Sequence, residues 1–184
     1  MKTKTITNKI FYSNKDIFEI ARLRVYSKSA NSCNVIMPHI CNNIDLFGAG
    51  FAHAISEKYP EVKNNYHLLG KKFLKDNPGY VQFIDVDYDK QYNRRLIVAN
   101  MIAQNGVRNA RNPRPLNYAY LLKSMLDIKK FILTKFNSEN PVEIHCPKFG
   151  SGLAGGDWKF IQCLIEDVWN SFKVVVYSYE NKKQ

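Results

Sequence analysis

Apolar residues recur along the chain in short runs whose spacing alternates between that of strands and that of helices. Strand-like runs cover residues 5–12, 34–40, 80–87, 94–101, 142–146 and 174–179. Helix-like segments cover residues 17–23, 51–58, 61–75, 116–136 and 158–170. Strands that alternate with helices indicate helices packed on both sides of one sheet, and the two middle strands are close enough for a hairpin. The pattern therefore predicts an α/β fold, a three-layer α/β/α sandwich with a mixed central sheet.

Prolines and short polar residues mark several of the expected boundaries. Asp157 precedes the last helix and suits its N-cap, and Pro115 suits the first turn of the long helix. Pro38 interrupts the strand 34–40, which predicts an irregularity or an unpaired N–H there. The apolar stripe expected to pack the long helix on the core consists of Leu122, Met125, Leu126, Ile128 and Ile132.

Length and composition suit one globular domain over residues 1–184, because 45% of the residues are hydrophobic and 13% are aromatic. No stretch of the sequence has the apolar length of a membrane span, and the first residues lead into a strand-like run instead of a secretory signal. We therefore expect a cytoplasmic protein without membrane contact. The 4 cysteines lie far apart without a CxxC pair, which predicts free thiols and no metal site. No cofactor is expected.

The charge balance points to an anionic partner. A total of 27 Lys and Arg against 16 Asp and Glu gives a formal net charge of +11, which favours a nucleotide or a nucleic acid. Arg108, Arg111 and Arg114 lie in one polar segment and could hold phosphate. A basic surface that is simply solvated explains the same charge, so charge alone does not decide between these interpretations.

Two glycine-bearing connections each lie between a predicted strand and a predicted helix. The first contains Gly48, Ala49 and Gly50, and the second runs over residues 150–156. Backbone N–H groups in such turns, together with the helix dipole, form an anion site. The second connection, GSGLAGG, fits neither the Walker loop nor a full dinucleotide fingerprint, and a tight turn that binds nothing is the alternative. Because both loops follow parallel strands, we expect them to face one crevice and to hold a diphosphate.

Several stretches match a known family in its order along the chain. They are residues 15–18 (KDIF), 39–42 (HICN), 47–52 (FGAGFA), 58–61 (KYPE), 146–152 (CPKFGSG), 158 (W), 164–167 (LIED) and 176–177 (VY). Together they resemble the macro domain, and within it the branch of yeast-type ADP-ribose 1″-phosphate phosphatases and terminal ADP-ribose glycohydrolases. The resemblance covers most of the chain and implies ADP-ribose or a derivative as the ligand, with an ADP-ribosylated protein as a candidate partner.

The resemblance implies binding roles for particular residues. Asp16, followed by Ile17, matches the acid that accepts from the adenine amine, although it also suits a helix cap. Tyr177 matches an aromatic that flanks adenine, and Phe149 one that packs on the distal ribose; core packing is the alternative for both. The two phosphate loops correspond to Gly48, Ala49 and Gly50, and to Gly150, Ser151, Gly152, Leu153, Ala154 and Gly155.

The resemblance also suggests catalytic residues. Asn42 matches an asparagine beside the distal ribose, and His39 could act as a general acid or base or be a core histidine. Gln104 and Leu153-Ala154 occupy the regions where glycohydrolases of this branch carry a lysine and an acid, so a lysine nucleophile is not expected.

The leading hypothesis is a domain that binds ADP-ribose and hydrolyses ADP-ribose 1″-phosphate or a related terminal-ribose derivative. The alternatives are a non-catalytic reader of ADP-ribose and a de-ADP-ribosylating hydrolase. A nucleic-acid-binding module is a less favoured interpretation.

Overall fold

The computed structural model describes residues 10–28, 32–137 and 139–178. Its strands are β1 (Phe11–Ser13), β2 (Asn34–Asn42), β3 (Val81–Asp89), β4 (Arg94–Gln104), β5 (Val142–Pro147) and β6 (Lys173–Tyr177). Its helices are α1 (Ile17–Tyr26), α2 (Gly50–Lys58), α3 (Pro60–Asp76), α4 (Tyr118–Lys135) and α5 (Trp158–Val168). Residues 5–9 of the first predicted strand, and residue 179 of the last, lie outside the described residues.

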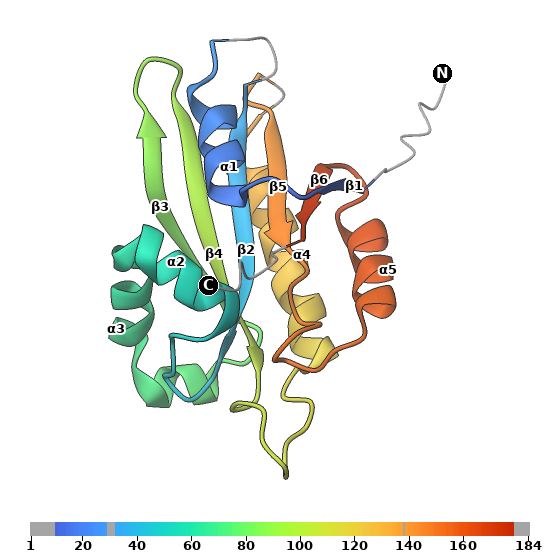
Figure 1. Ribbon diagram of the computed structural model, residues 1–184. Coiled ribbons are helices and arrows are strands. Elements are labelled where there is room, and N and C mark those ends of the chain that lie inside the picture. Colours follow the sequence, from blue (N-terminus) through green and yellow to red (C-terminus); the bar gives the residue numbers. More distant parts are fainter. Residues whose placement is uncertain (1–9, 29–31, 138, 179–184) are drawn as a thin grey trace.

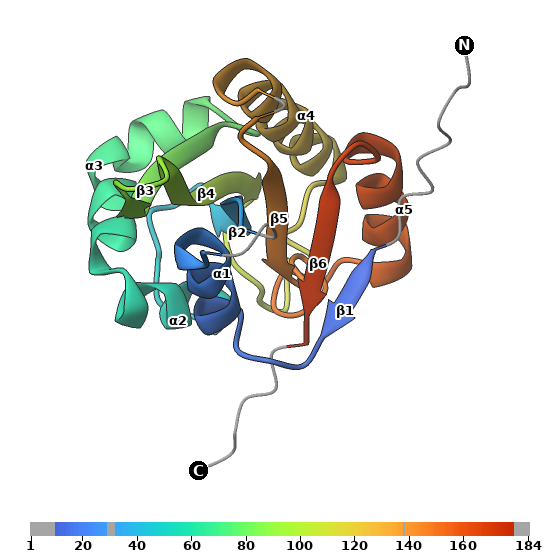
Figure 2. The ribbon, with the colours of Figure 1, turned by 90° about the horizontal axis from the view of Figure 1, so that it is seen from above.

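All the strands join one sheet in the order β1-β6-β5-β2-β4-β3 (Figure 1). Every neighbouring pair is parallel except β3 with β4, which form the predicted antiparallel hairpin. Helices α1, α2 and α3 cover one face of the sheet, and α4 and α5 cover the other (Figure 2). The predicted three-layer sandwich with a mixed sheet is therefore confirmed.

The carboxyl ends of β2, β4, β5 and β6 lie at the same edge of the sheet, at the bottom in Figure 1. The connections after β2, β4 and β5 gather at this edge, and both predicted glycine loops are among them. Parallel pairing alone requires this, because successive parallel strands end on the same side.

The long helix differs from its prediction in its start and in two of the five residues of its apolar stripe. Asn117 is the N-cap, since its Oδ1 accepts from the backbone N–H groups of Ala119 at 3.0 Å and Tyr120 at 3.1 Å. Pro115 therefore lies in the preceding connection and not in the first turn.

Met125, Ile128 and Ile132 of the predicted stripe are buried in the core, and Leu121 is buried beside them. Leu122 and Leu126, which were expected in the core, are 36% and 49% exposed. Adjacent helical positions point about 100° apart, so residues that flank a buried stripe can lie at the surface.

Pro38 pairs with Ala99 of β4 in regular register, while the pairing of β2 with β5 ends at Ile36. The irregularity predicted at Pro38 is therefore present on the β5 side, and on the β4 side the register shifts later, between Cys41 and Asn42. Within the described parts of the chain, no helix combines the length and apolar composition needed to cross a bilayer.

Candidate functional site

The two glycine loops meet at one crevice. A Cβ placed on Gly50 would lie 3.4 Å from Cδ1 of Leu153, so the loop after β2 touches the loop after β5. A cavity of about 300 Å³, the loop cavity, is lined by His39, Ile40, Ala49, Gly50, Phe51, Ala52, Gln104, Pro147, Lys148, Phe149, Gly150, Gly152, Leu153 and Ala154. The predicted convergence of the two loops is thus present in the structure. Of the predicted second-loop residues, Ser151 and Gly155 do not line the loop cavity.

A second cavity of about 510 Å³, the Arg108 cavity, adjoins the first. It is lined by Ile40, Cys41, Asn42, Leu46, Phe47, Gly48, Ala49, Ala52, Gln104, Val107, Arg108 and Leu153. Both cavities share Ile40, Ala49, Ala52, Gln104 and Leu153, so they form neighbouring parts of one crevice. The volumes of the two cavities are in the range of small-molecule binding sites.

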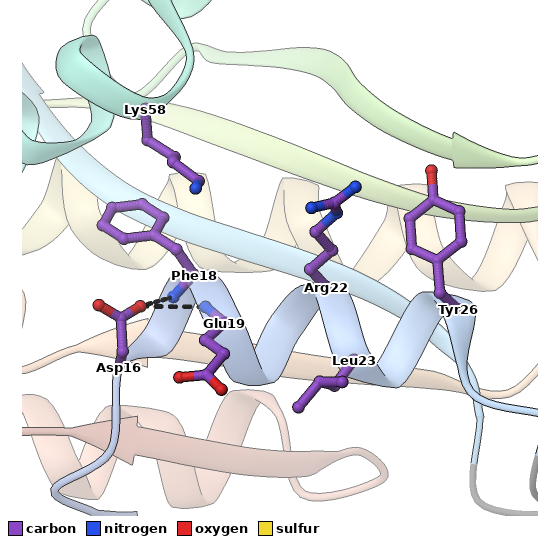
Figure 3. Close-up of a pocket in the computed structure, with 7 residues that line it drawn as sticks. All are labelled: Asp16, Phe18, Glu19, Arg22, Leu23, Tyr26 and Lys58. Carbon is purple, nitrogen blue, oxygen red and sulfur yellow. Dashed lines mark hydrogen bonds between the residues drawn. The ribbon is translucent and has the colours of Figure 1, made fainter.

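A third depression of about 480 Å³, the α1 groove, runs along the outer side of α1 (Figure 3). Its lining residues are Asp16, Phe18, Glu19, Arg22, Leu23, Tyr26 and Lys58, and Lys58 extends from α2 toward α1 near Phe18. The Phe18 ring stacks on Phe51 of the loop cavity, with centroids 5.6 Å apart. The α1 groove therefore begins beside the loop cavity.

The two loops present their backbone amides differently. Helix α2 starts at Gly50 behind Ala49, which makes no side-chain cap bond, so no side chain caps the first turn of α2. Helix α5 is capped as predicted: Asp157 Oδ1 accepts from the N–H groups of Lys159 at 2.7 Å and Phe160 at 3.4 Å. The start of α2 is consequently the better donor site for an anion.

The glycines of the second loop have distinct roles. A Cβ on Gly150 would approach Ile161 Cδ1 to 2.9 Å, one on Gly155 would approach the Pro113 oxygen to 2.7 Å, and both have positive φ. These two are required by the fold. A Cβ on Gly152 would meet nothing within 4 Å, and Gly152 lines the loop cavity. Gly152 is thus a glycine that packing does not demand, at a place where a ligand could approach the backbone.

Asp16 is exposed and caps α1, as the alternative interpretation expected. Its Oδ1 accepts from the N–H groups of Phe18 at 2.8 Å and Glu19 at 3.0 Å (Figure 3). The Ile17 side chain is 3% exposed and belongs to the core. Capping and a contact to adenine are compatible because a carboxylate has two oxygens, so the adenine contact stays a prediction.

Tyr177 and Phe149 are mainly core residues. Tyr177 is 2% exposed and donates its O–H to His145 Nδ1 at 2.8 Å, as expected for the core-packing alternative, and its contact with adenine stays a prediction. Phe149 is 4% exposed and packs edge-on against Trp158 and Trp169. It nevertheless borders the loop cavity, so a contact with the distal ribose stays a prediction.

The side chain of Asn42 holds the loop that follows it. Its Oδ1 accepts from the N–H groups of Ile44 at 3.0 Å and Leu46 at 3.2 Å and from the Tyr66 hydroxyl at 3.2 Å. Its Nδ2 donates to the Leu46 oxygen at 2.5 Å. Asn42 lines the Arg108 cavity, but its polar atoms are engaged within the protein, so any orienting role acts through the loop.

His39 is 1% exposed and lies at the back of the loop cavity. Burial lowers its pKa to about 4, although the bond of Nε2 to Asn100 Oδ1 at 2.5 Å partly offsets this. At neutral pH the ring is therefore uncharged, and Nε2–H is the donor to Asn100. A neutral, buried ring cannot serve as a general acid, and this geometry is that of the core histidine considered as the alternative.

The segment after β4 contributes lining residues, of which the sequence indicated only the arginines. Gln104 borders both cavities, and Val107 and Arg108 border the Arg108 cavity. Arg111 and Arg114 line neither, and Arg114 lies over the Tyr118 ring at 5.1 Å. The cluster of three arginines was the only signal in the sequence, and it does not reveal which one faces the crevice.

Acidic groups and metal ligands do not mark this site. Among the described residues, neither the loop cavity nor the Arg108 cavity is lined by an Asp or a Glu. The same residues contain no group of three His, Cys, Asp or Glu side chains that could hold a metal ion. The chemistry that these residues offer is therefore that of backbone amides, Gln104, Lys148 and Arg108.

Comparison with solved structures shows which fold this is. A protein of unknown function from Bacteroides thetaiotaomicron is 27% identical, with a TM-score of 0.73 over 94% of this chain and 99% of that one. A macrodomain protein from Streptomyces coelicolor is 24% identical, with a TM-score of 0.65 over 94% and 100%. A macrodomain mutant from Oceanobacillus iheyensis, solved with ADPR (ADP-ribose), is 16% identical, with a TM-score of 0.59 over 99% and 91%.

No protein-family model and no curated protein matches the chain. The structural likenesses show that the chain has the macrodomain fold.

Proposed function

We propose that this protein binds ADP-ribose, or a ligand that contains it, in the crevice between the two glycine loops. The observation that carries the proposal is the meeting of both loops at the carboxyl edge of the parallel strands. Amide donors from two loops suit the two phosphates of a diphosphate. The Oceanobacillus macrodomain, which has the same fold and was solved with ADPR, supports the choice of ligand.

The three depressions offer a place for each part of this ligand. The diphosphate lies in the loop cavity, against the start of α2 and Gly152, with Lys148 at the rim. The adenine lies at the end of the α1 groove, where Asp16 can accept from its amine. The distal ribose then enters the Arg108 cavity, beside the loop held by Asn42.

As the finer proposal, the protein hydrolyses ADP-ribose 1″-phosphate or a related terminal-ribose derivative. Fixed amides and cations would stabilise the charge that develops on the phosphoryl group, and Asn42 would orient the distal ribose through its loop. His39, neutral and bonded to Asn100, is left with the passive role of shaping the cavity wall. De-ADP-ribosylation of a protein is the alternative reaction at the same position.

A reader of ADP-ribose without turnover is the second candidate, and one observation favours it. Among the described residues, no carboxylate lines the two cavities at the sheet edge, and the histidine there has a pKa of about 4. A hydrolase without a carboxylate or a titratable histidine would lack the usual general base.

Binding is tested by calorimetry and thermal unfolding with ADP-ribose. We expect saturable binding, with a stabilisation of about 2.7 kcal/mol when the ligand is present at about 100 times its Kd. Gly152→Leu should weaken binding at least tenfold and leave the unfolding temperature without ligand nearly unchanged, because a Cβ at this position meets no atom within 4 Å. AMP is the control for binding through adenine alone. Absence of any heat or stabilisation at millimolar ADP-ribose would refute the proposal.

Turnover is tested separately. The protein is incubated with ADP-ribose 1″-phosphate, and released inorganic phosphate is measured for the wild type and for Asn42→Asp, which keeps the acceptor atoms and removes the donor. Release of inorganic phosphate by the wild type supports the proposed phosphatase activity. Tight binding with intact ligand after long incubation selects the reader, and loss of ADP-ribose from a modified protein selects the alternative hydrolase.

A further inference from the structure

The Arg108 cavity contains one cationic side chain and, within the described part of the chain, no acidic one. Its other polar side chains are Asn42 and Gln104, and the amide of Asn42 is engaged in its own loop. The rest of the lining is apolar or backbone. Arg108 is exposed and takes part in no ion pair with another described residue. The guanidinium is therefore available to a ligand.

The segment that carries Arg108 is held in place by hydrogen bonds at its base. Gly106 N–H donates to Asn43 Oδ1 at 2.8 Å, and Asn43 Nδ2 donates to Asn105 Oδ1 at 3.2 Å. Asn112 Nδ2 donates to the Asn105 oxygen at 2.7 Å and so closes the segment on itself. The backbone at Arg108 is thus fixed against the first glycine loop, which lowers the entropy lost when the side chain binds.

We propose that Arg108 determines specificity at the distal end of the crevice by selecting ligands that carry a phosphate monoester on the ribose remote from adenine. This rests on the proposed binding of ADP-ribose and adds the residue that would select a phosphate at that position. A guanidinium pairs with a phosphate through two parallel N–H donors, which favours this substituent by geometry as well as by charge. A neutral substituent gains nothing from the cation, and a positively charged one is repelled.

The experiment compares three ligands by calorimetry: ADP-ribose, ADP-ribose 1″-phosphate and the neutral 1″-O-methyl glycoside of ADP-ribose. Each is measured with the wild type, Arg108→Ala, Arg108→Lys and Arg111→Ala, and the phosphate ligand is checked for integrity afterwards. Arg111 is the matched control because it belongs to the same segment, carries the same charge and lines neither cavity.

The wild type should bind the 1″-phosphate about 10 to 100 times more tightly than the methyl glycoside, as expected for a charged hydrogen bond. Arg108→Ala should abolish this preference while its affinity for ADP-ribose changes less than about threefold. Arg108→Lys should retain part of the preference, and Arg111→Ala all of it.

Equal wild-type affinities for the two substituted ligands would overturn the role of Arg108, as would a preference that survives in Arg108→Ala. In both cases binding of ADP-ribose itself would still stand. Failure of the wild type to bind any of the three ligands would overturn the proposed function as well, so the two failures are distinguishable.

Discussion

Glu143 of β5 is the centre of a buried charge network, and its removal is the sharpest test of what stabilises this fold. The carboxylate is 7% exposed and accepts from Arg24 Nε at 3.0 Å, Lys173 Nζ at 3.0 Å and His145 Nε2 at 2.9 Å. Arg24 Nη2 donates to the second oxygen, which makes the pair bidentate. The network joins α1, β5 and β6.

The pKa of Glu143 reflects this setting. Burial by itself would raise the pKa, but the bonds from His145, Arg24 and Lys173 outweigh it and lower the pKa from 4.5 to about 2. Burial also lowers the pKa of His145, so that ring is neutral. Its Nε2–H then donates to Glu143, and its Nδ1 accepts from the Tyr177 hydroxyl.

The lowered pKa of Glu143 sets its expected contribution to the free energy of unfolding. A pKa lowered from 4.5 to about 2 corresponds to about 3 kcal/mol of stability. Because the pKa is lower in the folded state, this stability is complete above the unfolded pKa and is lost as the pH falls from about 5 toward 2. By pH 3 about 2 kcal/mol of it should be gone. Lys173 is 44% exposed and contributes least, since solvent screens its charge.

The assay is urea unfolding of the wild type and Glu143→Gln at several pH values. At pH 7 the variant should be about 3 kcal/mol less stable, with a melting temperature lower by roughly 6–12 °C. The difference should shrink toward pH 3, because Glu143 of the unfolded wild type binds a proton below about pH 4.5, whereas the folded protein resists protonation until about pH 2. Glu139→Gln, an exposed control, should change stability by less than about 0.5 kcal/mol. A difference below about 1 kcal/mol at pH 7, or one that is independent of pH, would refute the reasoning.

Two further predictions concern packing, and both are measured by urea unfolding. Leu121→Ala should lower the free energy of unfolding by about 2–5 kcal/mol, because Leu121 is fully buried. Leu122→Ala, at a 36% exposed position, should lower it by less than about 1 kcal/mol. The reverse order would contradict the observed orientation of α4. Gly156→Ala should lower the free energy of unfolding by at least about 2 kcal/mol, because its Cβ would lie 2.3 Å from Leu116 Cδ2 and 2.8 Å from a main-chain oxygen. Gly152→Ala should change it by less than about 0.5 kcal/mol. Equal effects of the two variants would show that the loop relaxes around the added methyl group.

Much of the architecture was predictable from local sequence patterns. Alternation of apolar runs located the strands, and helical spacing located the helices, because each depends on residues within a few positions of one another. Asp157 caps α5 as expected for a short polar side chain before a helix. Parallel strands alternating with helices also implied that Gly50 and Gly152 would reach the same edge, since that follows from topology without any side-chain detail.

What the sequence alone determined, then, was the order of the elements, the layered fold and the place of the two amide-rich loops. Only the tertiary structure decided that Tyr177 is buried against His145, that the amide of Asn42 is engaged by its own loop, and that Arg108 borders the crevice while Arg111 does not. These outcomes depend on how elements distant in sequence pack together. Short-range periodicity carries no information about which side chain then faces a cavity and which faces the core.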